Sequence, residues 1–353
     1  MNIPEHRKSI DKLDAQIVKL LNERTRHVLA IGEIKMKAGE EIYAPHRERA
    51  VLNRLSRLNS GPITNESLHA IYREVMSSAL SLEKSMTIAY LGPEATFTHQ
   101  AAIRRFGSSL RYSSQKTIAD VFTEVSKNRA DYGVVPVENS TEGVVTHTLD
   151  MFVDSELKIV AQIVLPVQHC LLSTGPRAQI RKLFGHPQSL GQCHMWVQNN
   201  LPKVEIIETS SNARSAEFAA REKGTAAIAG VLAAEKYKLD ILEYDIQDNA
   251  ANATRFLVLG RQCSPPTGHD RTSIMVSVTD KVGALHSALA AFRRYRINMT
   301  KIESRPSKRK AWEYFFFIDC DGHMQDRKVD NAIRHLGEHC NFVKVLGSYP
   351  NSE

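Results

Sequence analysis

The chain has 353 residues, of which 42% are hydrophobic and 24% charged, and its formal net charge is +7. This length predicts two or three domains, each large enough for its own core. Apart from a short basic cluster at Ser307–Lys310, the Lys and Arg residues are scattered through amphipathic segments. The positive charge therefore indicates a solvated surface, or attraction of small anionic substrates, rather than a nucleic-acid interface.

The cysteine spacing and the N-terminal residues indicate whether the protein binds a metal and where in the cell it is located. Five cysteines form no C-x-x-C pair and lack the His spacing of a zinc site, so we expect no metal and no other cofactor. An odd number of cysteines without a signal peptide is typical of free thiols in a reducing cytosol. Met1 to Asp14 is too charged for a signal sequence, and no apolar run approaches the length of a membrane span. We therefore expect a cytoplasmic protein that binds neither membranes nor nucleic acids.

A long first helix is predicted from Glu5 to about Ala38, because this stretch lacks proline and its apolar residues recur at helical spacing. Arg24 falls in a column of apolar residues, and Lys35 shares the neighbouring column with Arg7. A charge on a packing surface is costly unless it meets a partner. These cations therefore either extend to water or bind an anion.

Helix geometry limits which of these cations can share a ligand. At about 1.5 Å per residue, Arg24 and Lys35 lie roughly 16 Å apart along the axis, so the two long side chains can converge on one small anion. Arg7 lies roughly 25 Å from Arg24 on the same helix. If Arg7 serves such a site, that site belongs to a second protomer that runs antiparallel.

Two further helices are predicted, one after Pro45, a favoured first helical residue, and one from Thr64 to Glu83. With their charged residues, the segment from residue 1 to about 85 resembles the all-α chorismate mutases, three-helix proteins that form intertwined dimers and convert chorismate to prephenate. The resemblance implies that Arg7 of a second protomer, Arg24 and Arg47 hold carboxylates, that Lys35 and Glu83 face the ether oxygen, and that Glu48 faces the ring hydroxyl.

The chemistry suits such a site, because a Claisen rearrangement needs only a clamp on the reactive conformer and donors for the oxygen that gains charge. Two positions depart from the best-known mutase pattern. Ala44 and Ala79 stand where that pattern has Asp and Ser, so only backbone contacts are left there. A weakened mutase is therefore one alternative.

From Met86 onward, strands and helices are predicted to alternate. Met86–Leu91 is expected to be a buried strand that leads into the loop Gly92–Phe97. Further strands are expected near 110–114, 132–137, 158–165, 204–208, 225–229 and 256–260, and helices near 117–128, 141–153, 176–184, 189–199 and 212–222. This order predicts an α/β domain with parallel-type crossovers, which binds ligands at the carboxyl ends of its strands.

Polar residues follow several of these strands directly, where a ligand of such a sheet lies. Each by itself is the kind of residue that caps a helix or makes a turn. Their shared position nevertheless indicates a binding site. The residues are Thr96, Asn139, Ser140, Gln188, Ser189, Thr254 and Arg255.

Three segments in this region, Gly92–Phe97 (GPEATF), Gly133–Gly143 (GVVPVENSTEG) and Asn252–Phe256 (NATRF), look like the signature segments of prephenate dehydratases. The match spans about residues 86 to 262. It implies two α/β lobes, similar to periplasmic binding proteins, with the active site in the cleft between them. Thr254 matches the functional threonine of that family.

Prephenate loses carbon dioxide and hydroxide together, so the enzyme has to polarise the departing hydroxyl and keep the carboxylate poorly solvated. A hydroxyl donor such as Thr254 suits the first task, and apolar side chains such as Phe256 or Phe97 suit the second. Arg255 either binds the side-chain carboxylate or pairs with an acid.

A third domain, residues 270–353, is predicted after a linker at Cys263–His269. Strands near 271–279, 297–304, 311–319 and 342–348, with helices near 283–295 and 325–339, give the β-α-β-β-α-β order of a ferredoxin-like α+β fold. Two motifs here are either ordinary caps or, by resemblance to ACT regulatory domains, parts of a phenylalanine site at an interface between two such domains. They are Gly283, Ala284 and Leu285 at a helix start, and Glu303, Ser304, Arg305 and Pro306 at a strand end.

The order of the three regions, 1–85, 86–262 and 270–353, resembles that of the bifunctional P-proteins of phenylalanine biosynthesis. The resemblance implies a homodimer or higher homo-oligomer that converts chorismate to prephenate and then to phenylpyruvate, with feedback inhibition by phenylalanine. Two alternatives are a dehydratase with a weakened mutase domain and a non-catalytic amino-acid sensor.

Overall fold

The computed structural model describes residues 2–39, 42–307 and 313–351. The chain forms two compact units, one made of Met1–Thr87 with Arg105–Arg111 and the other of Ile88–Arg104 with Tyr112–Glu353. None of the helices in the described ranges is long and apolar enough to cross a membrane. Most of the basic cluster Ser307–Lys310, and the beginning of the strand predicted near 311–319, lie outside the described residues.

The first unit is built on three helices, as predicted: α1 (Ile3–Ala38), α2 (Pro45–Leu58) and α3 (Asn65–Glu83). Asn2 and Glu5 form a reciprocal capping box at the start of α1, and Gly39 ends the helix in the left-handed conformation that glycine adopts without strain. Thr64 caps α3 through its side chain.

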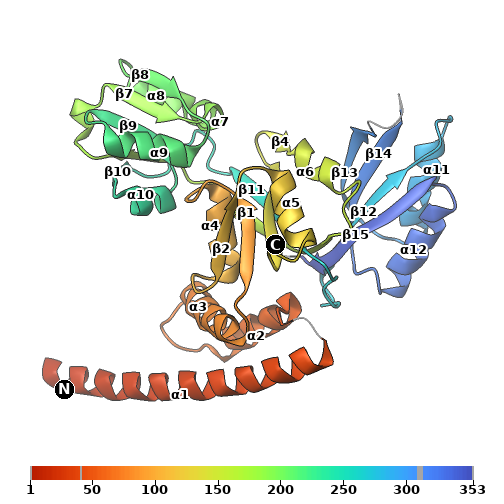
Figure 1. Cartoon of the computed structure of the whole chain (residues 1–353), viewed down its shortest axis with the longest axis horizontal. Coiled ribbons are helices and arrows are strands. Elements are labelled where there is room, and N and C mark those ends of the chain that lie inside the picture. The colour runs from red at the N-terminus through yellow and green to blue at the C-terminus, as the bar shows by residue number, and fades with distance from the viewer. Residues whose placement is uncertain (1, 40–41, 308–312, 352–353) are drawn as a thin grey trace. The chain divides into compact units, whose positions relative to one another are not determined.

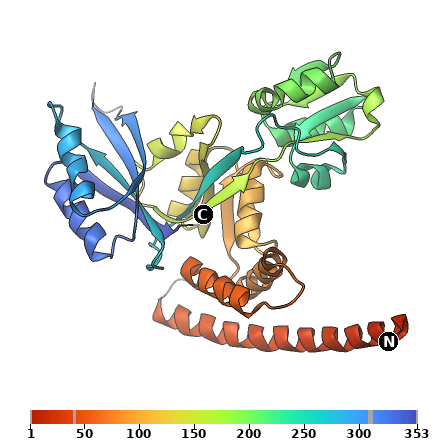
Figure 2. The same cartoon turned by 180° about the vertical axis from the view of Figure 1, so that it is seen from behind.

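The N-terminal part of α1 projects beyond α2 and α3 in both views (Figures 1 and 2). Its apolar side chains remain more than half exposed, among them Ile10, Leu13, Ile17 and Val18. An apolar stripe of this length on one helix face is typical of an interface with another chain.

The second unit contains three sheets. The first has the strand order β2-β1-β3-β11-β5, with β4 paired to β3. β1 runs parallel to β3, whereas β11 runs antiparallel to both β3 and β5. The strands are β1 (Thr87–Leu91), β2 (Arg111–Gln115), β3 (Tyr132–Asn139), β4 (Gly143–Val144), β5 (Lys158–Pro166) and β11 (Ala253–Gly260), and the helices α4 (Phe97–Phe106), α5 (Ile118–Ser126) and α6 (Thr146–Met151).

The second sheet, in the order β10-β6-β9-β7-β8, forms a separate lobe that Figure 1 shows in green. The chain enters it through residues 167–169 and leaves it through residues 244–252. The strands are β6 (Cys170–Ser173), β7 (Lys182–Gly185), β8 (Glu205–Glu208), β9 (Thr225–Ala229) and β10 (Asp240–Glu243), and the helices α7 (Pro187–Gln192), α8 (His194–Asn200), α9 (Asn212–Arg221) and α10 (Val231–Tyr237).

The predicted two-lobed α/β architecture is confirmed, but several local predictions are wrong. The end of the helix expected near 176–184 belongs to the strand β7, because a short buried apolar run does not distinguish a strand from a helix. The sequence-based prediction also lacks α4, β6, α10 and β10 and makes α6 too long. Both sheets contain antiparallel strand pairs, so the prediction of parallel-type crossovers is correct only in part.

The third sheet, β13-β14-β12-β15, is antiparallel and has the predicted ferredoxin-like order. Its elements are β12 (Asp270–Ser277), α11 (Ala284–Arg294), β13 (Met299–Pro306), β14 (Tyr314–Asp321), α12 (Arg327–Gly337) and β15 (Phe342–Pro350). Gly347 lets β15 lie against β5, because a Cβ atom at this position would come within 2.2 Å of the Ile159 carbonyl oxygen.

Candidate functional sites

A cavity of about 610 Å³ lies among α1, α2 and α3 of the first unit. All the residues predicted for a mutase site except Arg7 line this cavity: Arg24, Lys35, Ala44, Arg47, Glu48, Ala79 and Glu83. Arg7 is exposed on the projecting part of α1. The structure thus brings together the predicted residues that one chain can supply.

The cavity combines an excess of cations with two carboxyl groups. Nη1 of Arg24 is buried and has no hydrogen-bond partner among the described residues, while Nζ of Lys35 donates to the Ile42 carbonyl oxygen at 3.1 Å. Burial raises the pKa of the Glu83 carboxyl above its ordinary value, although the charges of Lys35 and Arg24 oppose that shift. A buried guanidinium nitrogen without an acceptor among the described residues favours an anionic ligand.

Gly32 on α1 determines how closely this helix approaches Glu83. A Cβ atom at position 32 would lie 2.7 Å from Oε2 of Glu83, so any larger residue displaces the carboxyl group. Gly32 is absent from the predicted site, because a glycine inside a helix has no side chain that could indicate a role in binding.

Glu48 is fixed by a residue outside the predicted mutase segment. Oε2 of Glu48 lies 3.1 Å from Nη2 of Arg105, and both side chains are largely buried. Burial raises the pKa of the Glu48 carboxyl, against the lowering effects of Arg105 and Arg73. His27, His46 and Tyr72 also line the cavity without having been predicted.

Thr254, at the start of β11, belongs to a hydrogen-bond network of neutral side chains. Its Oγ1 accepts a hydrogen bond of 2.8 Å from Nδ2 of Asn139, and the same amide donates to Oδ1 of Asn252 at 3.0 Å. Oδ1 of Asn139 accepts from the backbone N–H groups of Thr141 and Glu142, which fixes the orientation of the amide. Because Thr254 accepts here, its hydroxyl hydrogen stays available to an acceptor on a ligand.

The network continues into the second lobe. Nδ2 of Asn252 donates to Oε1 of Gln192 at 2.8 Å, and Nε2 of His169 lies 2.8 Å from the same oxygen. The ring of Phe97 meets that of His169 edge to face at 5.4 Å, and a Cβ atom at Gly230 would lie 3.2 Å from the Phe97 ring. Polar and apolar groups of both lobes therefore meet beside Thr254.

Four other predicted polar residues have local structural partners. The hydroxyl of Thr96 donates to the Pro93 carbonyl oxygen at the start of α4. Oγ of Ser140 accepts from the N–H of Ala253, which joins β11 to the end of β3. Ser189 is buried against Asn212, and the N–H of Gln188 donates to the side chain that caps α7. The hydrogen bonds of these four residues therefore give them capping and turn roles, in addition to any role in binding.

Arg255 makes acid pairs, which was one of its two predicted roles. Its Nη1 lies 2.8 Å from Oδ2 of Asp319 on β14, and its Nη2 lies 3.2 Å from Oε2 of Glu138. That Glu138 oxygen also lies 2.8 Å from Nζ of Lys301 on β13. Phe256 is 1% exposed and lies in the interior of the lobe. The prediction that these two side chains contact substrate is therefore at odds with their positions.

In the third sheet, a cavity of about 470 Å³ lies at the start of α11 and is lined by Ala284 and Leu285, with Tyr314 and Asn341 opposite. Gly283 precedes it in the left-handed conformation. The second predicted motif, Glu303–Pro306, lies on the edge strand β13 and does not line this cavity. Within one chain, the two motifs do not form one pocket.

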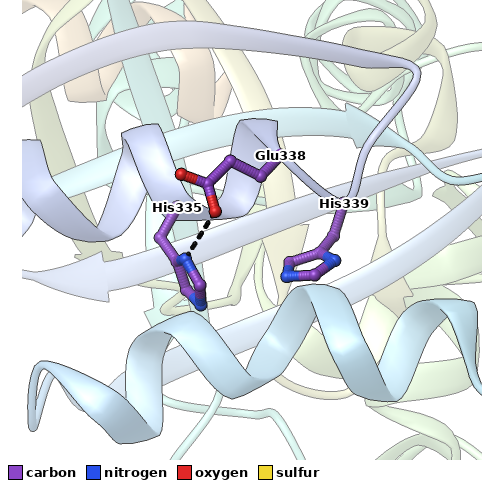
Figure 3. Close-up of side chains that lie close together, drawn as sticks. All are labelled: His335, Glu338 and His339. Atoms are coloured by element: carbon purple, nitrogen blue, oxygen red, sulfur yellow. Dashed lines mark hydrogen bonds and ion pairs between the residues drawn. The ribbon is translucent and has the colours of Figure 1, made fainter.

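One cluster in the described part of the chain has the chemistry of a metal site. Ligand atoms of His335, Glu338 and His339, at the end of α12, lie within 4.8 Å of one another (Figure 3). Nδ1 of His335 lies 3.0 Å from Oε2 of Glu338. Glu338 and His339 are exposed, so this cluster could hold a divalent cation only at the surface. The sequence predicted no metal, and that expectation stays a prediction.

Comparisons with known proteins assign a family to each region of the chain. Family models match residues 6–84 as chorismate mutase type II, 88–264 as prephenate dehydratase and 272–338 as an ACT domain. A bifunctional chorismate mutase/prephenate dehydratase from Aquifex aeolicus is 49% identical over 355 residues, covering 99% of this chain and 98% of the relative. One from Escherichia coli is 30% identical, covering 98% of this chain and 95% of the relative. The chain belongs to this family of bifunctional enzymes.

Solved structures support the same assignment for the second unit. The crystal structure of prephenate dehydratase from Arthrobacter aurescens in complex with L-Phe is 32% identical, with a TM-score of 0.71. The match covers 75% of this chain and 90% of the Arthrobacter chain. The dehydratase from Staphylococcus aureus is 26% identical, with a TM-score of 0.66, and covers 75% and 100%. A bifunctional chorismate mutase/prephenate dehydratase with an ACT domain is a catalyst, so a non-catalytic sensor is excluded.

Proposed function

We propose that this bifunctional chorismate mutase/prephenate dehydratase binds chorismate in the cavity of the three helices. Arg24 and Arg47 hold its carboxylates, Lys35 and protonated Glu83 donate to the ether oxygen, and Glu48 accepts from the ring hydroxyl. The observation that carries this proposal is the buried Nη1 of Arg24, which has no partner among the described residues and lies in the same cavity as a carboxyl group of raised pKa. A donor that strengthens as the ether oxygen gains charge lowers the barrier without a nucleophile.

The mutase site is completed by a second copy of the chain. The exposed apolar stripe of α1 and the distance of Arg7 from the cavity of its own chain support this arrangement. In an antiparallel pair of α1 helices, Arg7 of each protomer reaches the cavity of the other. Mutase activity then requires a homodimer or a larger assembly.

Prephenate binds beside Thr254, whose hydroxyl donates to the departing hydroxyl group while Asn139 holds the threonine oxygen in place. The fixed amide of Asn139 and the meeting of both lobes at His169 and Gln192 support this role. Apolar contact from Phe97 keeps the carboxylate poorly solvated, which favours loss of carbon dioxide. Thr96, Ser140, Gln188 and Ser189 shape this site mainly through the backbone that they fix.

Phenylalanine binds to the ACT domain between two copies, with the Gly283–Leu285 helix start from one copy and Glu303–Pro306 from the other. The separation of these motifs within one chain supports a site shared between copies. Binding there inhibits the dehydratase. We place the enzyme in the cytosol, which is supported by its five free cysteines.

One experiment tests the two activities together. Purified protein is incubated with chorismate while chorismate, prephenate and phenylpyruvate are followed over time, with and without phenylalanine. We expect transient prephenate and then phenylpyruvate, and less phenylpyruvate when phenylalanine is present. Consumption of added prephenate without consumption of chorismate would favour the alternative of a dehydratase with a weakened mutase.

A further inference from the structure

Residues 105–111 lie within the dehydratase part of the sequence but pack on the mutase helices. The N–H and Oγ of Ser108 donate to the Glu74 carboxylate, with 3.0 and 2.6 Å to its Oε2, and the N–H of Ser109 donates to Oγ of Ser77 at 3.2 Å. A Cβ atom at Gly107 would lie 2.4 Å from that of Ser77, so the backbone of this segment is in close contact with α3. The mutase-type match ends at residue 84, before this segment.

Arg105 brings a charge from this segment to the substrate cavity. Its guanidinium lies 5.6 Å from the centre of the Tyr43 ring, and Tyr43 in turn lies 5.0 Å from the Phe106 ring. These two rings are 4% and 2% exposed, so they hold the end of α4 in a fixed position. From there, Nη2 of Arg105 reaches Oε2 of Glu48 at 3.1 Å.

We propose that Arg105 is a positioning residue of the mutase site, which holds one oxygen of the Glu48 carboxylate so that the other can accept a hydrogen bond from the ring hydroxyl of chorismate. This inference rests on the proposed role of Glu48. Burial alone favours the neutral form of the Glu48 carboxyl. The guanidinium of Arg105 opposes this, because a charge-assisted hydrogen bond favours the anion and also fixes its geometry. A helix of the dehydratase sequence thereby supplies part of the mutase site.

The test uses the full-length enzyme with Arg105→Met, which removes the charge, and Arg105→Lys, which keeps it. Arg104→Met is the matched control, because Arg104 is the neighbouring cation on α4 and is exposed. A hydrogen bond to the ring hydroxyl is present in both the ground state and the transition state, so its loss raises KM more than it lowers kcat. For Arg105→Met we expect the KM for chorismate to rise about tenfold, with a smaller change in kcat. Arg105→Lys should recover part of the loss, and Arg104→Met should match the parent.

Dehydratase turnover of added prephenate serves as the folding control and should be unchanged in all three variants. A structural role is tested by combining Arg105→Met with Glu48→Gln, since positioning through Glu48 predicts that Arg105→Met adds little in that background. An unchanged KM for chorismate in Arg105→Met, or a full additional loss in the Glu48→Gln background, would overturn the inference. A parent enzyme that leaves chorismate untouched would instead overturn the proposed mutase function itself.

Discussion

The two catalytic regions are built from different kinds of side chain. The helical cavity is lined by cations and buried carboxyl groups such as Arg24 and Glu83, whereas Thr254 lies in a network of hydroxyl and amide groups. The proposed reactions explain this difference. The Claisen rearrangement keeps both carboxylates and gains charge at one oxygen, so strong cationic contacts help throughout. The dehydratase has to release one carboxylate as carbon dioxide, and a tight cationic clamp on that group would oppose its loss.

The largest effect is expected for Thr254→Ala, which removes the proposed donor to the departing hydroxyl group. Loss of one such donor typically costs about two to three decades in rate. Phenylpyruvate formation should fall by this factor while prephenate still accumulates from chorismate. Thr254→Ser keeps the hydroxyl and should retain most of the activity, so equal losses in the two variants would argue for a packing role.

Gly32→Ala tests whether mutase activity depends on the position of the Glu83 carboxyl group in the helical cavity. The added methyl group displaces the Glu83 carboxyl, so kcat/KM for chorismate should fall by about tenfold or more, the scale of one lost charge-assisted contact. The protein should not become less stable, because alanine favours a helix over glycine by about 1 kcal/mol. Thermal unfolding and mutase kinetics measure the two effects. Gly61→Ala, where no atom lies within 4 Å of the new Cβ, is the control.

The pH dependence should separate the two activities. Glu83 donates to the ether oxygen only when protonated, and burial raises its pKa. Mutase turnover should therefore fall as the pH rises through that pKa, by about tenfold per pH unit where this group limits the rate. Glu83→Gln should flatten this profile and leave dehydratase turnover of prephenate unchanged. Identical mutase profiles in the parent and Glu83→Gln would remove Glu83 from this role.

The smallest effect is expected from subunit mixing, which tests whether only the mutase needs two copies. Arg7→Ala and Arg24→Ala are each expected to be poor mutases. After equal mixing and random exchange, half of the dimers are mixed, and each of these has one intact site, so about a quarter of the sites regain both residues. Dehydratase turnover should not change on mixing. No recovery, with exchange shown by differently tagged subunits, would contradict the shared site.

Helix geometry predicts that Arg24 and Lys35 can reach one anion, because the separation of the two residues along the helix axis is within the span of two long side chains. In the structure both residues line the helical cavity. Gly32 lies about one turn from Lys35 and about two turns from Arg24 on the same helix, but its role depends on how closely α3 approaches, which spacing does not encode.

The dehydratase network was harder to predict from the sequence. Its members come from segments that meet only after folding, so Gln192 and His169 gave no local signal. Asn252 is part of a quoted motif, but motif letters do not reveal that its amide joins Asn139 to Gln192. Arg105 likewise gives no local signal, because the sequence pattern does not predict α4 and the Glu48 partner is distant in the sequence.

The alternation of side chains along β11 has a mechanical consequence. Successive residues of a strand point to opposite faces, so Thr254 joins the Asn139 network while Arg255 pairs with Asp319 of the ACT sheet. Glu138, next to Asn139 on β3, is likewise paired with Lys301 of the ACT sheet. A shift of the ACT sheet must therefore either separate these partly buried charges or pull on the two peptides that carry Thr254 and Asn139. β11 therefore carries a contact with the ACT sheet on one face and the hydrogen-bond network of Thr254 on the other.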